Sequence, residues 1–136
     1  MQNAFQNLNW LSVVIAAVSA FILGSLWYSP LLFSKRWMKE TGLTDESLKD
    51  ANMVKIFGLA FILMFFASFM LAMFVGKDAG AAFGATAGFM AGLGWVFTFM
   101  GVTYLFERKS LALFLIDACY SVVALTIMGL IIGAMQ

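Results

Sequence analysis

The chain of 136 residues contains no histidine, one cysteine and one proline. Without histidine, haem ligation and histidine-based metal sites are excluded, so we expect no metal and no cofactor. One cysteine cannot form a disulfide within the chain. Histidine is also the side chain used most often as a general base, and no Gly-x-Ser-x-Gly motif or pair of membrane carboxylates takes its place. The sequence therefore predicts a protein that is not an enzyme.

Charge is scarce as well. Charged residues make up 11% of the chain and hydrophobic residues 63%, whereas a soluble domain carries about 25% charged residues and about half apolar ones. The net charge of +1 and the lack of a basic tail argue against a nucleic-acid partner. We expect a single transmembrane domain over residues 1–136, with the lipid bilayer as its partner.

Four apolar stretches are each long enough to cross a bilayer, which takes about 20 residues. They cover residues 8–28, 53–75, 79–106 and 111–135. The first lacks a basic leading region and a cleavage motif, so we expect it to stay in the membrane as an anchor. Three residues join the second and third spans and four join the third and fourth, and such short links force antiparallel neighbours. The predicted fold is an all-α bundle of four transmembrane helices.

Residues 30–52, between the first two spans, predict a short amphipathic helix in the headgroup layer. Ser29 can cap this helix with Pro30 in its first turn, and Gly42 ends it. Thr44 then caps a polar turn that we expect to continue into the second span. The amphipathic helix has an aromatic side with Trp37 and a basic side, suited to lipid headgroups, with Lys35, Arg36 and Lys39.

The basic residues also predict the orientation of the chain. Seven of the eight lysines and arginines would lie on one side of the membrane and only Lys77 on the other. Because cytoplasmic loops carry the excess of positive charge, we place both termini outside the cytoplasm and the segment 30–52 on the cytoplasmic leaflet.

Glycine recurs at every fourth position around the start of the third span. Positions four apart lie nearly above one another on a helix, so the run predicts a stripe along one helix face. In water each glycine would weaken a helix by about 1 kcal/mol relative to alanine, but in lipid such a stripe lets another helix backbone come close. The stripe consists of Gly76, Gly80, Gly84, Gly88 and Gly92.

Two further faces of small residues have the same spacing. They are Ala16, Ala20 and Gly24 in the first span, and Gly129 and Gly133 in the fourth. Stripes of this kind mate either within one chain or between chains. Two arrangements stay open: one monomeric bundle uses every stripe, or one face remains for a second copy and makes a homo-oligomer.

Asp117 is the one ionisable residue placed well inside a span, about 9 Å from the start of the fourth helix at roughly 1.5 Å per residue. An isolated charge in the membrane costs about 2.5–3.5 kcal/mol on insertion scales. In a functional role Asp117 would carry a proton or contact a cation. In a structural role it would accept a hydrogen bond from Tyr120 or Tyr104, or pair with Lys35 or Arg36.

The region around the end of the first span resembles a known family of bacterial membrane proteins. The residues that carry the resemblance are NWL at 9–11, GSLWYSPLLF at 24–33, WM at 37–38 and GL at 42–43. The family is catalogued as domain of unknown function 1761. The resemblance implies a four-helix membrane domain over nearly the whole chain, in a bacterial inner membrane, and it implies no activity. It singles out Trp27, Tyr28, Ser29 and Pro30 as a unit that anchors the helix end and turns the chain.

Three functions are compatible with these features. The first, which we prefer, is a homo-oligomeric channel or small transporter whose polar route is lined by Asp117, Tyr104 and Tyr120. The second is a scaffold or accessory subunit that binds another membrane protein, or a second copy, through its glycine stripe. The third is a lipid-interacting protein that works through the basic residues of segment 30–52.

Overall fold

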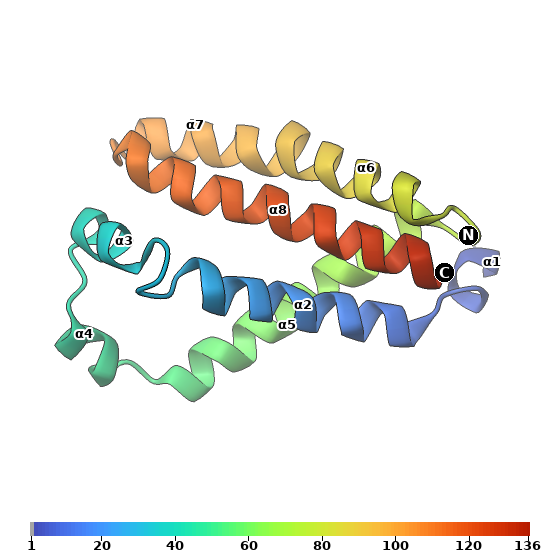
Figure 1. Cartoon of the computed structure of the whole chain (residues 1–136), viewed down its shortest axis with the longest axis horizontal. Helices are drawn as coiled ribbons and strands as arrows, with labels where there is room; N and C mark the ends of the chain where they lie inside the picture. The colour runs from blue at the N-terminus through green and yellow to red at the C-terminus, as the bar shows by residue number, and fades with distance from the viewer. Residues whose placement is uncertain (1) are drawn as a thin grey trace.

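The computed structural model describes residues 2–136 as a bundle of long helices with short helices at its two ends (Figure 1). The first, second and fourth spans are the continuous helices α2 (Trp10–Trp27), α5 (Met53–Val75) and α8 (Leu111–Met135). The third span is a helix in three parts: α6 (Ala81–Ala91), the π-helical η1 (Gly92–Phe97) and α7 (Thr98–Phe106). The short helices are α1 (Gln2–Gln6), α3 (Ser34–Thr41) and α4 (Asp45–Asp50).

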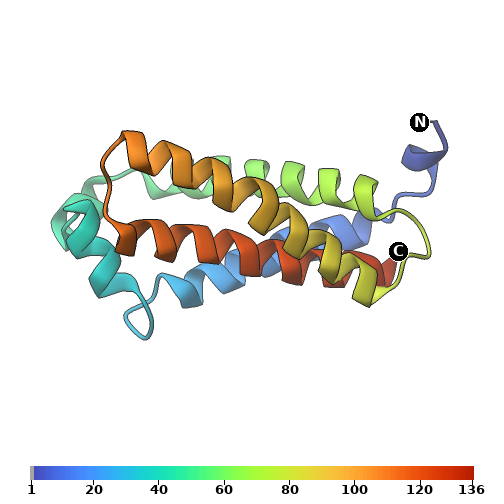
Figure 2. The same ribbon diagram turned by 90° about the horizontal axis from the view of Figure 1, so that it is seen from above.

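The central helix of the bundle is α8. It lies between the third span on one side and α2 and α5 on the other (Figures 1 and 2), and it packs against all of them. The buried core sits toward the end of the bundle where the two termini lie. It consists mainly of Val13, Ala16 and Ala20 from α2, Leu71, Ala72 and Val75 from α5, and Ala124, Met128 and Ile132 from α8.

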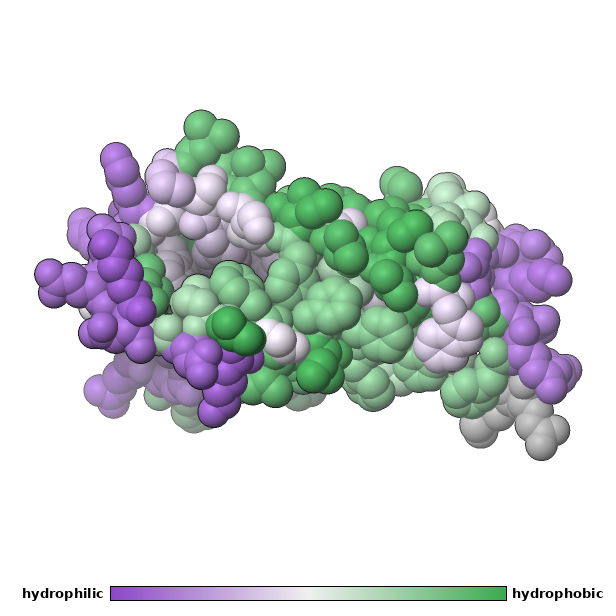
Figure 3. Space-filling view, turned by 90° about the horizontal axis from the view of Figure 1, so that it is seen from below, coloured by the Kyte–Doolittle hydropathy of each residue, from purple (hydrophilic) through white to green (hydrophobic). Residues whose placement is uncertain are grey.

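The surface has the polarity of a membrane protein. Apolar side chains cover its middle, and polar side chains gather at its two ends (Figure 3). Large apolar side chains point outward, and Val54 and Phe106 keep 86% of their surface exposed, as expected where lipid tails replace water. Four helices are long and apolar enough to cross a membrane. The predicted fold class, an all-α transmembrane bundle, is confirmed.

Only the second half of α5 belongs to the core. Its buried residues lie between Ser68 and Val75, and Ser68 Oγ donates a hydrogen bond of 2.8 Å to the Val13 carbonyl in α2. Toward its first residue α5 turns away from α2 and α8, so the helices diverge at the end that carries α3 and α4 (Figure 1). The bundle is therefore closed at one end and open at the other.

Three of the long helices begin at a polar side chain that accepts a hydrogen bond from the backbone of the first turn. Asn9 caps α2, Asn52 caps α5 and Ser110 caps α8, with N···O distances of 3.1–3.3 Å. Thr44 caps α4 as predicted. The expected continuation of α4 into the second span is wrong, because α4 ends at Asp50 and the cap at Asn52 starts a new helix.

The segment before α3 also differs from the prediction. We expected Ser29 to cap a helix with Pro30 in its first turn, but residues 29–33 form successive turns and α3 starts only at Ser34. The backbone N–H of Ser34 donates to the Ser29 carbonyl at 3.1 Å. These turns fold the chain back beside the end of α2. Gly42 ends α3 in the left-handed conformation, with φ of 75°, as predicted.

Part of the glycine stripe packs backbone to backbone against α8. A side chain on Gly84 would overlap the carbonyl oxygen of Gly129, and one on Gly88 would overlap the carbonyl oxygen of Leu125. The requirement is mutual, since side chains on Gly129 and Gly133 would overlap carbonyl groups at the start of the third span. The stripes of the third and fourth spans therefore mate with each other within one chain.

The stripe is shorter than the spacing suggests. A Cβ on Gly92 would lie 2.8 Å from the Cα of Val122 in α8, so this glycine continues the contact. Gly76 and Gly80, however, lie outside the helix, in the turn between α5 and α6. Their φ angles of 74° and 89° are left-handed, and a Cβ on either would meet open space. Including Gly76 in a helix-packing stripe is wrong, because the turn requires it for its backbone conformation. Gly80 is the N-cap of α6, and its carbonyl group still lies against Gly133 of α8.

The small residues of α2 are also used within the chain. Ala16 and Ala20 lie in the core, and a Cβ on Gly24 would lie 3.2 Å from the Tyr120 hydroxyl oxygen. All three faces of small residues thus find their mates inside one chain. Of the two arrangements that stay open from the sequence, this is the one in which a single bundle uses every stripe.

Replacing Gly88 by alanine should loosen the contact between α6 and α8, because the new Cβ meets backbone atoms that cannot move aside. We expect the free energy of unfolding to fall by at least about 2 kcal/mol, measured by denaturant titration in detergent micelles. Gly58→Ala is the matched control, since Gly58 is also helical but a Cβ there meets open space. Equal losses in the two variants would contradict the packing of the stripe against α8.

Candidate functional site

Asp117 accepts hydrogen bonds from two tyrosines that belong to other elements. It lies in the second turn of α8. Tyr28 Oη donates to Oδ1 at 2.8 Å, and Tyr104 Oη donates to Oδ2 at 2.7 Å. Both distances are typical of strong hydroxyl bonds to a carboxyl oxygen. The side chain thus connects the end of α2, the third span and α8 at one point.

Of the partners expected for Asp117, the structure shows Tyr104. Tyr120 donates instead to a backbone carbonyl of α2 at 2.8 Å. The expected pairing with Lys35 or Arg36 is wrong, since the ion pairs within residues 2–136 lie elsewhere. Neutral hydroxyl groups, and no cation, therefore hold the acid.

Tyr28, the unexpected partner, is placed by the end of α2. Its backbone N–H donates to the Gly24 carbonyl at 3.0 Å and closes the last turn of the helix. Trp27 Nε1 donates to the Ile116 carbonyl of α8 at 3.0 Å and ties the helix end to α8. From the sequence we expected Tyr28 only as an interfacial anchor. The signal that could have found its role is the WYSP segment that carries the family resemblance.

The π-helical segment η1 explains how Tyr104 reaches Asp117. In a continuous α-helix Tyr104 would point about 120° away from Gly92, which faces α8. A π-bulge inserts one extra residue into a turn, which reduces this difference to about 20°. The Thr98 hydroxyl donates to two carbonyls of η1, each at 2.9 Å, and so satisfies backbone groups of the wider turn. The regular helix expected for the third span is therefore interrupted where the site requires it.

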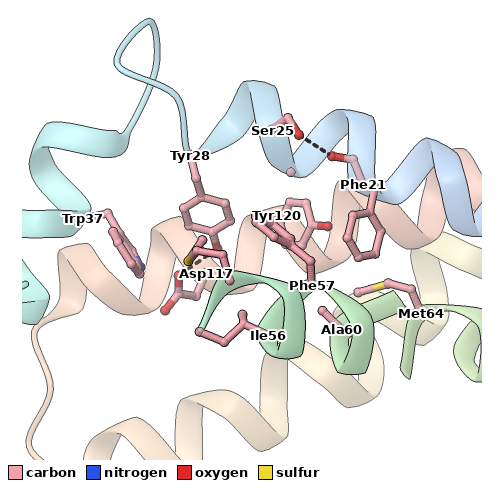
Figure 4. A pocket seen from close by; sticks show the side chains of 12 residues that line it. Phe21, Ser25, Tyr28, Trp37, Ile56, Phe57, Ala60, Met64, Asp117 and Tyr120 are labelled. Carbon is pink, nitrogen blue, oxygen red and sulfur yellow. Dashed lines mark hydrogen bonds between the residues drawn. The ribbon is translucent and has the colours of Figure 1, made fainter. Parts of the chain in front are cut away.

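A cleft of about 640 Å³ opens beside Asp117 (Figure 4). Asp117 and Tyr120 of α8 form its floor, α2 and the first half of α5 form its walls, and Trp37 of α3 stands at one end. The hollow is visible on the molecular surface near the end that carries α3 and α4 (Figure 3). Its volume is typical of ligand sites, which range from about 300 to 1,000 Å³. The walls are mostly apolar, with Phe21, Gly24, Ser25 and Tyr28 on one side and Met53, Ile56, Phe57, Ala60 and Met64 on the other.

The cleft exists because large side chains hold α2 and α5 apart at this end. The ring of Phe21 contacts those of Phe57 and Phe61, with centroids 6.4 and 5.6 Å away. In the core, by contrast, small residues such as Ala16 let the helices approach. Ile56 and Phe57 remain 49% and 53% exposed. The cleft therefore opens sideways, toward the surface that lipid tails would cover.

The basic residues of α3 lie outside the cleft lining. Lys35, Arg36 and Lys39 are exposed, and α3 lies at the same end of the bundle as the cleft (Figure 1). The Ser110 hydroxyl and the Arg36 guanidinium, which forms an ion pair with Glu40, lower the pKa of the Glu40 carboxyl. The exposure of the three bases is compatible with the expected contact to lipid headgroups.

The opposite end of the bundle carries a smaller pocket of about 170 Å³. Gln136 closes it from one side, and its Nε2 donates to the carbonyls of Ala72 and Gly76 at 3.1 and 2.8 Å. Residues 2–136 contain no group of three histidine, cysteine, aspartate or glutamate side chains that could hold a metal ion. The cleft at Asp117 is therefore the larger site, and the one that contains the intramembrane acid.

Asp117 and Tyr104 should be coupled energetically. Replacing Tyr104 by phenylalanine leaves one carboxyl oxygen without its donor, so we expect the unfolding free energy in micelles to fall by about 1–3 kcal/mol. In an Asp117→Leu background the same replacement should have less than half this effect. Tyr120→Phe is the control, because the Tyr120 hydroxyl donates to a backbone carbonyl of α2 and not to Asp117. The loss of unfolding free energy in Tyr120→Phe should therefore agree in both backgrounds within about 0.5 kcal/mol. If Tyr104→Phe lowered the unfolding free energy equally with Asp117 and with Asp117→Leu, the hydrogen bond between Tyr104 and Asp117 would be contradicted.

Comparison with known proteins places the chain in a family. Residues 11–133 match the family described as "Protein of unknown function (DUF1761)". No curated protein and no solved structure matches the chain. The matched region contains the cleft, Asp117 and nearly all of the four long helices. The protein belongs to this family of unknown function, DUF1761, as the WYSP segment and its surroundings had suggested.

Proposed function

We propose that the protein is a small proton-linked transporter whose substrate site is the cleft at Asp117. The observation that carries the proposal is a single acid, held by tyrosine hydroxyls, on the floor of a cleft that faces lipid (Figure 4). Ionisable residues inside membrane spans are costly, and they mark proton and substrate paths. The role is binding and transport rather than catalysis.

The bonds to Asp117 are of a kind that a substrate or a proton can replace. Hydrogen bonds to a charged group contribute about 1.5–3 kcal/mol each. A substrate contact of equal strength would compensate for the loss of one such bond. Tyr28 follows the last residue of α2 and precedes turns rather than another helix. Its ring can therefore leave Asp117 without unwinding a transmembrane span.

The distribution of packing favours a transporter over an open channel. Toward the termini the bundle is closed by the fully buried side chains of Val13, Met128 and Ile132. A solute in the cleft would reach the other side only after the helices rearrange, as they do in alternating access. The wider turn of η1 provides a place where the third span can bend.

The alternative functions have weaker support. A scaffold that binds through the glycine stripe needs that stripe on its surface, whereas Gly84 and Gly88 are buried against α8. A homo-oligomer would have to form through the outer apolar faces instead. Action on lipid through α3 is supported by its exposed bases, but it leaves Asp117 and the cleft without a role.

The proposal includes an orientation, with both termini outside the cytoplasm of a bacterial cell and the cleft in the cytoplasmic half of the inner membrane, because of the charge bias. In a Cys119→Ser background, Ser47→Cys in α4 should react with a membrane-impermeant maleimide only after spheroplasts are permeabilised. Asn3→Cys should react in intact spheroplasts. The reverse pattern would contradict this orientation.

Proteoliposomes that contain a pH-sensitive dye test the transport itself. After an acid pulse, the wild-type protein should speed proton entry relative to empty vesicles, and Asp117→Asn should abolish this protein-dependent flux. Asp78→Asn is the matched control, since it changes the same residue type in the exposed turn between α5 and α6. No flux through the wild type, or equal flux through Asp117→Asn, would overturn the proposed function.

A further inference from the structure

We infer that the substrate of the cleft is an amphipathic organic cation, with a tertiary or quaternary ammonium or a phosphonium head on an apolar body. The inference rests on the proposed function for this site, and it assigns a chemical class that the proposal leaves open. Three properties of the cleft carry it: a carboxyl with neutral donors, aromatic rings around that carboxyl, and a long apolar wall.

Aromatic rings surround Asp117 inside the cleft. Tyr28 lies edge-on to Trp37, with ring centroids 5.8 Å apart, and edge-on to Tyr120, with centroids 5.5 Å apart. All three rings line the cleft together with Asp117 (Figure 4). Aromatic faces attract alkylated cations by about 0.5–2 kcal/mol without any hydrogen bond. A carboxyl among such rings therefore recognises a weakly hydrated organic cation.

The α5 wall is suited to the apolar body of such a molecule. Phe57, Ala60 and Met64 face the cleft, and the wall from Met53 to Met64 is about 16 Å long, at roughly 1.5 Å per residue. Methionine side chains fill irregular spaces and adapt to different partners. The site therefore fits a class of apolar bodies rather than one rigid shape.

The opening of the cleft admits a ligand from the lipid rather than from water. Ile56 and Phe57 border it and are about half exposed, on a helix whose outer face meets the bilayer. An amphipathic molecule first enters the leaflet with its charged head near the interface. Asp117 lies about 9 Å along α8 from its first residue, within reach of such a head. The substrate then passes sideways between α2 and α5.

Charge separates this class of ligand from others. An anionic lipid would bring a like charge to Asp117, and the bases that suit a phosphate, Lys35, Arg36 and Lys39, do not line the cleft. A neutral lipid would gain little attraction from the carboxyl, because the tyrosine hydroxyls already donate hydrogen bonds to it. A cation is the class for which the acid adds attraction in a medium of low dielectric constant.

Binding of radiolabelled tetraphenylphosphonium to the protein in phosphatidylcholine nanodiscs tests the inference. We expect saturable binding above that of empty nanodiscs, displaced by octyltrimethylammonium but not by octanesulfonate, which has the same chain and the opposite charge. Asp117→Asn should weaken binding at least about tenfold, and Trp37→Ala about fivefold. Unchanged binding in Asp117→Asn, or equal displacement by the two octyl compounds, would overturn the inference.

Two further variants separate recognition from folding. Tyr104 lies outside the cleft lining, and Tyr104→Phe frees one oxygen of Asp117 from a competing donor. Binding should therefore become tighter, even though stability falls. Phe99→Ala, at a side chain 73% exposed on α7, should leave binding unchanged. If Tyr104→Phe weakened binding as much as Asp117→Asn, the carboxyl would act only through the fold and the inference would be wrong.

The substrate class and the transport function fail separately. Tetraphenylphosphonium binding that depends on Asp117, in a protein without proton flux, would support the substrate class and overturn transport. Proton flux that depends on Asp117, in a protein that does not bind tetraphenylphosphonium, would support transport and overturn the substrate class.

Discussion

The close backbone contact between α6 and α8 organises the bundle. At Gly84 and Gly88 there is no room for even a methyl group, because carbonyl groups of α8 occupy the space. The contact fixes the third span against α8 along one line. The wider turn of η1 then rotates the part of the third span that follows it, so that Tyr104 in α7 points toward α8 and reaches Asp117. Packing in one half of the bundle thus positions a polar site in the other half.

The two ends of the bundle differ because their side chains differ in size. Small residues such as Ala16 and Ala72 let α2 and α5 pack together at the end near the termini. Phenylalanines hold the same two helices apart at the other end, where the cleft opens. In a membrane such an opening faces lipid tails, and Asp117 gives its floor a polar group. One pair of helices therefore provides both a rigid core and an accessible site.

The polar site shows how much of a membrane protein can be read from local patterns. The cost of a charge in hydrocarbon singles out Asp117, and the short link before α8 makes Tyr104 a reasonable partner. Tyr28 is separated from Asp117 by 89 positions, and no periodicity connects them. Its place depends on where α2 ends and how the chain turns afterwards, and Ser29 and Pro30 there form turns instead of the expected helix start.

Local patterns in the sequence predict the membrane class, the four spans, the cap at Thr44 and the unusual position of one acid. These features follow from short-range rules, because a bilayer demands about 20 apolar residues per crossing and each cap acts within one turn. The fold alone establishes which glycines pack against α8 and which shape a turn, since residue spacing carries no information about backbone φ angles. It also decided which hydroxyls reach Asp117 and that a cleft lies beside it, because both depend on the angles at which long helices cross and diverge.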